Sequence, residues 1–424
     1  MSRRARRSPH GCCRRGPVLL LVLATLVGWG AASHPRAARA AASTKHKHQK
    51  PTTKTTARVP QGFVGMDVDG PLMTAGTGVN LNSQVGAMVA DGVESVRVGF
   101  SWAAAQPYAS AADVPAGQSG QYTEAGGVPT DFRSTDQVVG TAARRRLSVL
   151  PTVIYAPSWD AQPNPNQDGG FPLLRQDAPY AAYLTALIGR YGPHGSFWSQ
   201  NPGLPKMPIR AWQIWNEPNL GRYWQQPFAS SYVSLLRAAH TAVKRADPGA
   251  RVVLGALTNA AWRSLAAVYR VRGARALFDV VSVNVFTKLP KHVMLGLRYV
   301  RSTMRRYGDG AKPMLATEVS WPSAVGSTAV HYDFDTTQAG QARNLATLLP
   351  LIGKQRQALG LAGFYYYTWM GDETRDNPEF DFAGLLSYSN GSVRAKPALA
   401  AFRSGVLALE GCRRKGAVAT SCIR

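Results

Sequence analysis

The strongest constraint on the fold is a regular alternation of eight apolar runs with eight helical patterns between Val59 and about Ala401. The apolar runs cover residues 63–67, 95–101, 148–155, 209–215, 251–257, 280–286, 313–319 and 363–369. The helical patterns cover residues 83–91, 136–145, 178–191, 231–246, 262–272, 292–307 and 338–359, and the last begins near Pro397. Near-continuous apolar runs are typical of strands buried on both faces, so the sequence predicts an α/β fold, a single (β/α)8 TIM barrel.

A doubly wound parallel sheet is the main alternative to the barrel. The eight repeats, and the lack of a glycine-rich phosphate loop after the first run, argue against it. We place the barrel at residues 59–408, with long loops after the second and third strands at residues 102–135 and 159–177. In barrels such loops build the active face. The segment 192–208, rich in Pro and Gly, is expected to be a loop before the fourth strand.

The N-terminus has the composition of an export signal. Residues 1–17 hold six Arg, residues 18–32 are uncharged, and small residues with A-x-A sites follow up to Ala42. This order predicts a secretory signal peptide at residues 1–42 and a secreted or envelope-associated protein. An uncleaved anchor is the alternative, but the uncharged run is shorter than the roughly 20 residues that span a bilayer. The Thr-rich segment 43–58 is predicted to be a basic flexible linker.

The net charge of the 424-residue chain is +25, and 13 of its basic residues lie in residues 1–58, which hold no Asp or Glu. Subtracting them leaves +12 for the rest of the chain. We expect no nucleic-acid partner, because the sequence has no recognised binding module and its basic density concentrates in removable or flexible segments. A basic body could attract an acidic polysaccharide or an anionic envelope; a solvated surface without a specific partner is the alternative.

Four cysteines occur, two at each end of the chain. Cys12 and Cys13 lie in the predicted signal peptide and should leave with it. Cys412 and Cys422 lie in the C-terminal tail, residues 409–424, which is rich in basic residues. In an oxidising compartment this pair can form a disulfide that fixes the tail, and free thiols are the alternative.

Two glutamates stand where apolar strands give way to polar and aromatic residues. Glu217 ends the fourth predicted strand and Glu318 ends the seventh, about 100 residues later. In a barrel both lie at the C-terminal rim and face each other across the mouth. Two opposed carboxylates can flank a glycosidic bond, one as acid and one as nucleophile. Since both groups are side chains, we expect no cofactor and no metal.

The residues Trp215-Asn216-Glu217-Pro218, followed by Glu318, resemble the active-site strands of glycoside hydrolase clan A. The likeness covers most of residues 60–405 and is greatest for family 39-like and cellulase-like secreted bacterial members. Further fitting stretches are 97, 100–102, 106–107, 155–159, 367–369, 382–386 and 396–398.

The resemblance implies a role for each matching residue. Glu217 would be the general acid/base and Glu318 the nucleophile of a mechanism that retains anomeric configuration through a covalent glycosyl-enzyme. Asn216 would bind the sugar 2-OH, and Arg97 would keep Glu318 ionised. One departure stands on strand six, where such families usually carry a His and a Tyr two residues apart. Here Asn284 and Phe286 occupy those places, and Phe286 has no hydroxyl with which to bond the nucleophile.

Aromatic residues at strand ends are the candidate sugar-stacking platforms. Trp is seldom fully buried, and these residues follow or end predicted strands, although a plain core role is the alternative. With Arg97, Asn216 and Asn284, the expected substrate-binding residues are Trp102, Tyr155, Trp159, Trp321 and Trp369. Tyr223 and Trp224 are candidates for an outer subsite.

The sequence therefore predicts a secreted retaining glycosidase that cleaves O-glycosidic bonds, β bonds by expectation, in a poly- or oligosaccharide. The alternative is a carbohydrate-binding envelope protein on a barrel that has lost catalysis. Only the changed residues of strand six support it. A binder has no reason to keep both Glu217 and Glu318.

Overall fold

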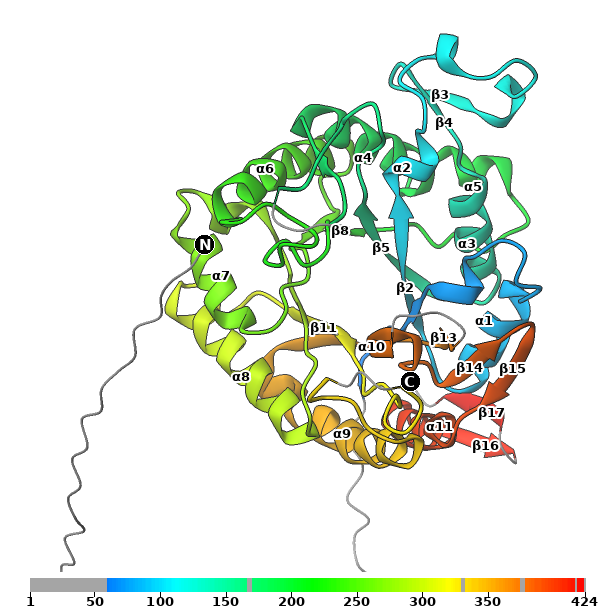
Figure 1. Ribbon diagram of the computed structural model, residues 1–424, viewed down its shortest axis with the longest axis vertical. Coiled ribbons are helices and arrows are strands. Elements are labelled where there is room, and N and C mark those ends of the chain that lie inside the picture. The colour runs from blue at the N-terminus through cyan, green and yellow to red at the C-terminus, as the bar shows by residue number, and fades with distance from the viewer. Residues whose placement is uncertain (1–58, 166–169, 329–331, 374–377, 416–417, 423–424) are drawn as a thin grey trace, which may run out of the picture. The chain divides into compact units, whose positions relative to one another are not determined.

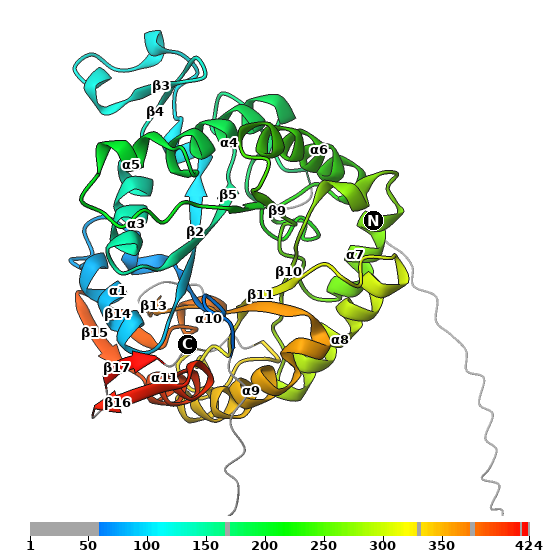
Figure 2. The ribbon, with the colours of Figure 1, turned by 180° about the vertical axis from the view of Figure 1, so that it is seen from behind.

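The computed structural model describes residues 59–165, 170–328, 332–373, 378–415 and 418–422. The predicted signal peptide 1–42 and linker 43–58 lie outside the described residues and stay predictions. Figures 1 and 2 look along a ring of strands from its two sides, with the long helices around it.

The ring consists of eight parallel strands in the sequential order of a barrel. They are β1 (Val64–Val68), β2 (Ser95–Ser101), β5 (Ser148–Ile154), β8 (Ala211–Ile214), β9 (Arg251–Val253), β10 (Val281–Asn284), β11 (Met314–Val319) and β12 (Leu361–Tyr366). The hydrogen-bonded order is β10-β11-β12-β1-β2-β5-β8-β9. Parallel bridges Val253–Val280 and Leu257–Val283 join β9 to β10 and close the ring. The predicted (β/α)8 barrel and its eight strand positions are confirmed.

A long helix follows each strand of the barrel, as predicted. The helices are α1 (Leu81–Ala90), α3 (Arg133–Arg144), α4 (Asp177–Tyr191), α6 (Ala229–Ala246), α7 (Ala261–Arg270), α8 (Pro290–Arg306), α9 (Gln338–Leu359) and α11 (Pro397–Glu410). Their starts follow local chemistry: Asn80 and Thr337 accept backbone N–H groups at the N-termini of α1 and α9, and Pro397 opens α11. Such caps satisfy donors that have no partner inside the helix.

Two buried tyrosines on the outer helices hold the strand ends that carry the site. Tyr180 of α4 donates its hydroxyl to Val153 O at 2.8 Å, on β5. Tyr232 of α6 donates to Ile214 O at 2.8 Å and accepts from Gly255 N at 2.6 Å, so it links β8 to the segment after β9. Buried hydroxyls with satisfied partners fix geometry that apolar packing alone leaves loose.

The loops at the C-terminal ends of the strands carry most of the short elements. The loop after β2 forms α2 (Trp102–Ala105), two 3-10 turns, and the hairpin of β3 (Thr123–Ala125) and β4 (Val128–Thr130), which projects beyond the ring of helices in Figure 1. After β5, β6 (Ala161–Gln162) pairs with β7 (Leu173–Leu174). The segment 192–208, expected to be a plain loop, contains the short helix α5 (Ser196–Gln200), because Phe197 and Trp198 are buried there.

The region after β12 contains β13 (Met370–Asp372), α10 (Pro378–Asp381), β14 (Leu386–Ser389) and β15 (Ser392–Ala395). Lys396 fastens this region to the loop after β11: its buried Nζ donates to Ser323 Oγ at 2.9 Å, Glu373 Oε1 at 3.2 Å and Phe382 O at 2.8 Å. Burial lowers the pKa of Lys396 to about 8, against the opposing charge of Glu373. The fastened segments carry several residues of the site described below.

The chain ends in a hairpin of β16 (Cys412–Lys415) and β17 (Val418–Cys422). Cys412 is disulfide-bonded and stands opposite Cys422 in the strand register. Among the described residues, no helix combines the length and apolar character needed to cross a membrane.

Candidate active site

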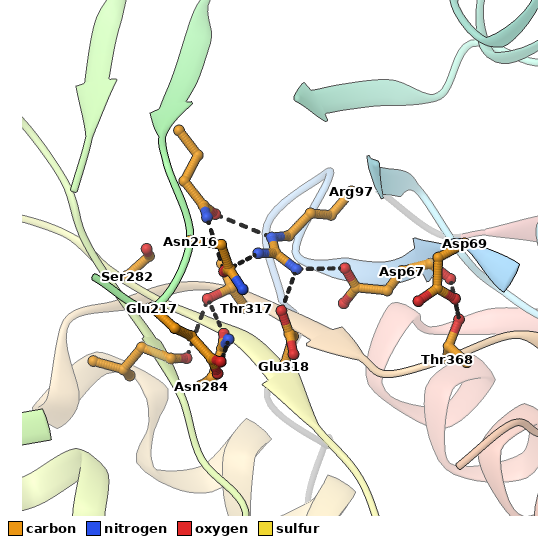
Figure 3. Close-up of polar contacts among 12 residues, drawn as sticks. Asp67, Asp69, Arg97, Asn216, Glu217, Ser282, Asn284, Thr317, Glu318 and Thr368 are labelled. Atoms are coloured by element: carbon orange, nitrogen blue, oxygen red, sulfur yellow. Dashed lines mark hydrogen bonds and ion pairs between the residues drawn. The ribbon is translucent and has the colours of Figure 1, made fainter. Parts of the chain in front are cut away.

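Glu217 and Glu318 lie at the carboxyl ends of β8 and β11, on opposite sides of the barrel mouth. Their exposed fractions are 8% and 7%, so each is nearly withdrawn from water yet lines a cavity. Figure 3 shows both side chains among polar residues contributed by several strands. The barrel thus brings together two residues that are about 100 positions apart in the sequence.

The backbone is strained where it leaves the strands at the mouth. Trp215 and Glu217 have φ of 64° and 45°, and Tyr155, directly after β5, has φ of 70°. Residues with a Cβ seldom adopt this left-handed region, and such conformations concentrate at functional sites. Two contacts hold the turn: Glu217 N donates to Ala256 O at 2.9 Å, and Trp215 Nε1 donates to Tyr223 O at 2.9 Å.

Arg97 of β2 is the centre of the polar network in Figure 3. Its Nη1 donates to Glu318 Oε1 at 2.7 Å and to Asp67 Oδ1 at 2.6 Å. Its Nη2 donates to Asn216 Oδ1 at 2.8 Å, and its Nε donates to Gln213 Oε1 at 3.0 Å. All three nitrogens of this buried guanidinium therefore have partners, and its fixed fork sets the positions of two carboxylates and two amides.

Burial and charge oppose one another in this network. The pKa of Glu318 is raised above its ordinary value, because burial raises it more than the charge and hydrogen bond of Arg97 lower it. Burial also raises the pKa of Asp67 well above its usual range, against the same Arg97. Burial alone would lower the pKa of Arg97, but Asp67 and Glu318 overcome this and the pKa is raised. Arg97 is therefore a permanent cation, and Glu318 depends on it to stay ionised.

Asn284 of β10 borders both glutamates. Its Nδ2 donates to Glu217 Oε1 at 2.8 Å, and the residue stands opposite Glu318 in the register of β10 and β11. Thr317 Oγ1 donates to Asn284 Oδ1 at 2.9 Å, which fixes which end of the amide faces the carboxyls. The departure from the family pattern at this position therefore leaves the acid/base candidate with a hydrogen-bond donor.

Two adjoining cavities open at the mouth, which we call the inner and outer cavities. The inner cavity has a volume of about 180 Å³ and the outer one about 330 Å³. The residues that line only the inner cavity include Asp67, Arg97, Thr152, Tyr155, Asn216 and Glu318. Those that line only the outer cavity include Arg222, Asn259, Phe286, Phe334, Asp372 and Asp381. Asp69, Glu217, Tyr223, Tyr367 and Phe380 line both.

Three of the tryptophans expected to stack on sugar lie in the core instead. Trp102 and Trp321 are fully buried and Trp369 is 1% exposed. Their ring N–H groups bond to Gln106 Oε1 (Trp102), Thr287 O (Trp321) and Gln84 Oε1 (Trp369). A ring without an open face cannot stack on a ligand, so these residues position loops and strand ends rather than meeting substrate.

The other aromatic candidates divide between cavity and core. Tyr155 and Tyr223 line the cavities as expected, and burial raises the pKa of each hydroxyl, so both remain hydrogen-bond donors. Trp159 is partly buried, packs edge-on against Trp102 and does not line either cavity. Trp224 is 5% exposed and donates to Ser231 Oγ, so it belongs to the core.

Several lining residues were not singled out from the sequence. Asp67 lies near the carboxyl end of β1 and Asp69 directly follows that strand. A carboxylate at a strand end is the signal that identified Glu217 and Glu318, and it would have found both aspartates. Asp69 accepts from Thr368 Oγ1 at 2.7 Å, and its charge raises the pKa of Glu318. Phe334 lies in the loop after β11 and Phe380 in the short helix α10, so neither stands at a strand end and neither carries that signal. Among the described residues, no group of three metal-ligating side chains converges.

The barrel is similar to solved glycoside hydrolase structures. With a family 39 glycoside hydrolase from Bacteroides cellulosilyticus WH2 the TM-score is 0.56 at 18% identity, over 84% of this chain and 65% of that chain. With a monomeric beta-xylosidase from Caulobacter crescentus CB15 the TM-score is 0.57 at 17% identity, over 83% of this chain and 69% of that chain. With the GH53 catalytic domain of Ignisphaera aggregans the TM-score is 0.55 at 18% identity, over 82% of this chain and 98% of that chain.

No family model matches the sequence, and a search of curated proteins finds no match either. At the identities above, the structural likeness establishes the fold. The resemblance indicated by Trp-Asn-Glu-Pro and Glu318 is thereby confirmed at the level of the barrel. The chain spans about two thirds of the length of the first two proteins.

Proposed function

We propose that this protein is a secreted retaining glycoside hydrolase, with Glu217 as general acid/base and Glu318 as nucleophile. The observation that carries the proposal is the pairing of the two carboxyls with different partners at one cavity. Arg97 holds Glu318 at 2.7 Å, whereas the neutral amide of Asn284 holds Glu217 at 2.8 Å. A cation favours an ionised nucleophile, and a neutral partner is compatible with a protonated acid.

In the first step the Oε of Glu318 forms a bond to the anomeric carbon as the bond to the leaving oxygen breaks. Glu217 transfers its proton to that oxygen, and the leaving group departs neutral. In the second step water gives a proton to Glu217 and attacks the anomeric carbon, which releases Glu318 as a carboxylate. Two inversions give net retention, and no cofactor enters the balance.

The contacts of Asn284 support retention over inversion. Asn284 donates to Glu217 Oε1 at 2.8 Å and stands opposite Glu318 in the register of β10 and β11, so both carboxyls border one small residue. Retaining enzymes hold their carboxyls about 5–5.5 Å apart, whereas inverting enzymes leave room for a water at about 6.5–9.5 Å. The position of Asn284 next to both glutamates favours the shorter separation.

The substrate we propose is a poly- or oligosaccharide with a β-glycosidic bond. Tyrosine hydroxyls lining the cavities remain protonated, because burial raises the pKa of Tyr155 and Tyr367, and protonated phenols can donate to sugar oxygens. Export rests on the predicted signal at residues 1–42. An acidic glycan stays a prediction from the +12 charge of the body.

The test is a screen of the exported protein against β-linked polysaccharides and aryl glycosides, with Glu217→Ala and Glu318→Ala as controls. Sugar release by the wild type and not by the variants is the expected result. Variants as active as the wild type would refute the assignment. Tight binding of one glycan without release would favour the carbohydrate-binding alternative. The mass of the exported protein tests removal of residues 1–42.

A further inference from the structure

The position of Glu217 between the two cavities gives them different parts in the reaction. Glu217 lines both cavities, whereas Glu318, Arg97 and Asn216 line only the inner one. The nucleophile must reach the anomeric carbon of the sugar that stays on the enzyme. The acid must reach the oxygen that leaves with the other part of the substrate. The retained sugar therefore belongs in the inner cavity and the leaving group in the outer cavity.

One side of the outer cavity is an aromatic wall formed by Phe286, Phe334 and Phe380. The ring of Phe286 lies 5.6 Å from that of Phe334 and 5.2 Å from that of Phe380. Tyr367 packs edge-on against Phe380 at 5.5 Å. The wall joins loops that follow β10, β11 and β12, and its three phenylalanines are only partly buried. Phe286 stands where related families carry the Tyr that bonds the nucleophile.

Tyr332 continues the wall outward, stacked on Phe334 at 5.8 Å and 44% exposed. Polar groups border the rest of the outer cavity, among them Arg222 and Asn259. Arg222 lies over the ring of Phe171, with its guanidinium carbon 5.2 Å from the centroid. An apolar wall of aromatic rings with polar groups around it suits a ring that has a C–H face and a hydroxylated edge, which describes a pyranose.

We infer that the outer cavity binds the leaving group as a saccharide ring stacked on the Phe286–Phe334–Phe380 wall. The inference rests on the proposed glycosidase function and deepens it. The best-bound substrate then spans both cavities, with at least one sugar on each side of the cleaved bond. Phe286 then contacts the leaving group and affects substrate specificity, whereas the Tyr of related families bonds the nucleophile.

The experiment compares leaving groups that do and do not reach the wall. The probes are β-xylosyl, β-glucosyl, β-galactosyl and β-mannosyl fluorides, and the 4-nitrophenyl glycosides and β-1,4-linked disaccharides of the same sugars. Fluoride leaves the outer cavity empty. The variants are Phe286→Ala and Phe334→Ala, with Phe334→Leu where alanine impairs folding. Tyr299→Ala is the matched control, because Tyr299 is 45% exposed and packs on Trp262 on the helices outside the barrel.

We expect each wall variant to lose about tenfold in kcat/KM on the disaccharide and less than about twofold on the fluoride, as expected for one lost ring contact. The control should match the wild type on both. Equal losses on fluoride and disaccharide would overturn the inference, since the wall would then serve the retained sugar. A loss confined to the nitrophenyl glycoside would overturn it in favour of an aromatic leaving group. A wild type inactive on every fluoride would instead refute the proposed function.

Discussion

The inner and outer cavities share Glu217 but differ in the kinds of residues that line them. At the inner cavity, Arg97 hydrogen-bonds four residues that lie on β1, β8, β11 and the turn after β8. We call Arg97 and these partners, with Glu217 and its donor Asn284, the floor. The outer cavity has on one side an aromatic wall from the segments that follow the strands, where rings contact one another, as Phe286 does with Phe380. The hydrogen bonds at the inner cavity fix the charge and position of the carboxyls. The aromatic wall of the outer cavity gives an apolar surface for a ligand to pack against.

From this difference we expect the floor to carry out the reaction and the wall to select among leaving groups. Changing a group in the floor alters the charge of the nucleophile or the hold on the acid, so it should affect every substrate. Changing Phe286 or Phe334, which line only the outer cavity, should affect only substrates that fill that cavity. The largest losses of kcat/KM are therefore expected for variants of the floor.

The largest expected effect is at the two carboxylates. Glu318→Ala should abolish turnover of every substrate, because no nucleophile remains. Glu217→Ala should lower kcat/KM by about a thousandfold on a disaccharide, whose leaving group needs a proton, and by much less on a glycosyl fluoride. Added azide should restore turnover in Glu217→Ala as a glycosyl azide of retained configuration. Equal losses on both substrates in Glu217→Ala would contradict the assigned roles.

The next effect is at Arg97. Arg97→Met should lower kcat/KM by about a hundredfold on all substrates. Because Arg97 lowers the pKa of Glu318, its removal raises that pKa, and the acid limb of the pH profile should move to higher pH. Arg133→Met is a matched control, since Arg133 is largely exposed and pairs with Asp131 away from both cavities. An acid limb that stays in place would show that Arg97 does not set the ionisation of Glu318.

A smaller effect is expected at Asn284. Asn284→Ala removes the donor to Glu217 and should lower kcat by about tenfold, as expected for one hydrogen bond, with little change in KM. Thr317→Val removes only the hydroxyl that orients the amide, so it should act in the same direction and less strongly. Measured kcat values unchanged in both variants would show that Asn284 has no part in the reaction.

The smallest effect on catalysis is expected at the buried tryptophans. Trp321→Phe loses the hydrogen bond to Thr287 O and should reduce the free energy of unfolding by about 1–2 kcal/mol. The KM should stay within about twofold of the wild-type value, in contrast to the wall variant Phe334→Ala. Denaturant unfolding and steady-state kinetics measure the two quantities. A raised KM with unchanged stability would return Trp321 to the role of a sugar platform.

The two glutamates could be predicted from the sequence and the aromatic wall could not, for a physical reason. Strand ends converge in a barrel whatever their separation in sequence, so the alternation predicts that Glu217 and Glu318 lie together at the mouth. Arg97 beside Glu318 follows from the resemblance to clan A, and its partner Asp67 was not singled out. Phe334 comes from a loop and Phe380 from the short helix α10, and the paths of such segments are not encoded in any period. The predicted tryptophans show the same limit. A position after a strand end predicts that Trp321 lies near the mouth, but it does not predict the direction of the ring. In the structure the ring is fully buried in the core.

A covalent sugar on Glu318 is the intermediate that defines the proposed mechanism, and it can be trapped. The protein is incubated with a 2-deoxy-2-fluoro β-glycosyl fluoride of the sugar that it hydrolyses fastest, and then digested for peptide mass analysis. We expect loss of activity and one fluorosugar on the peptide that contains Glu318, with no label in Glu318→Ala. Inactivation with the label on another residue, or continued turnover with no label, would contradict this mechanism.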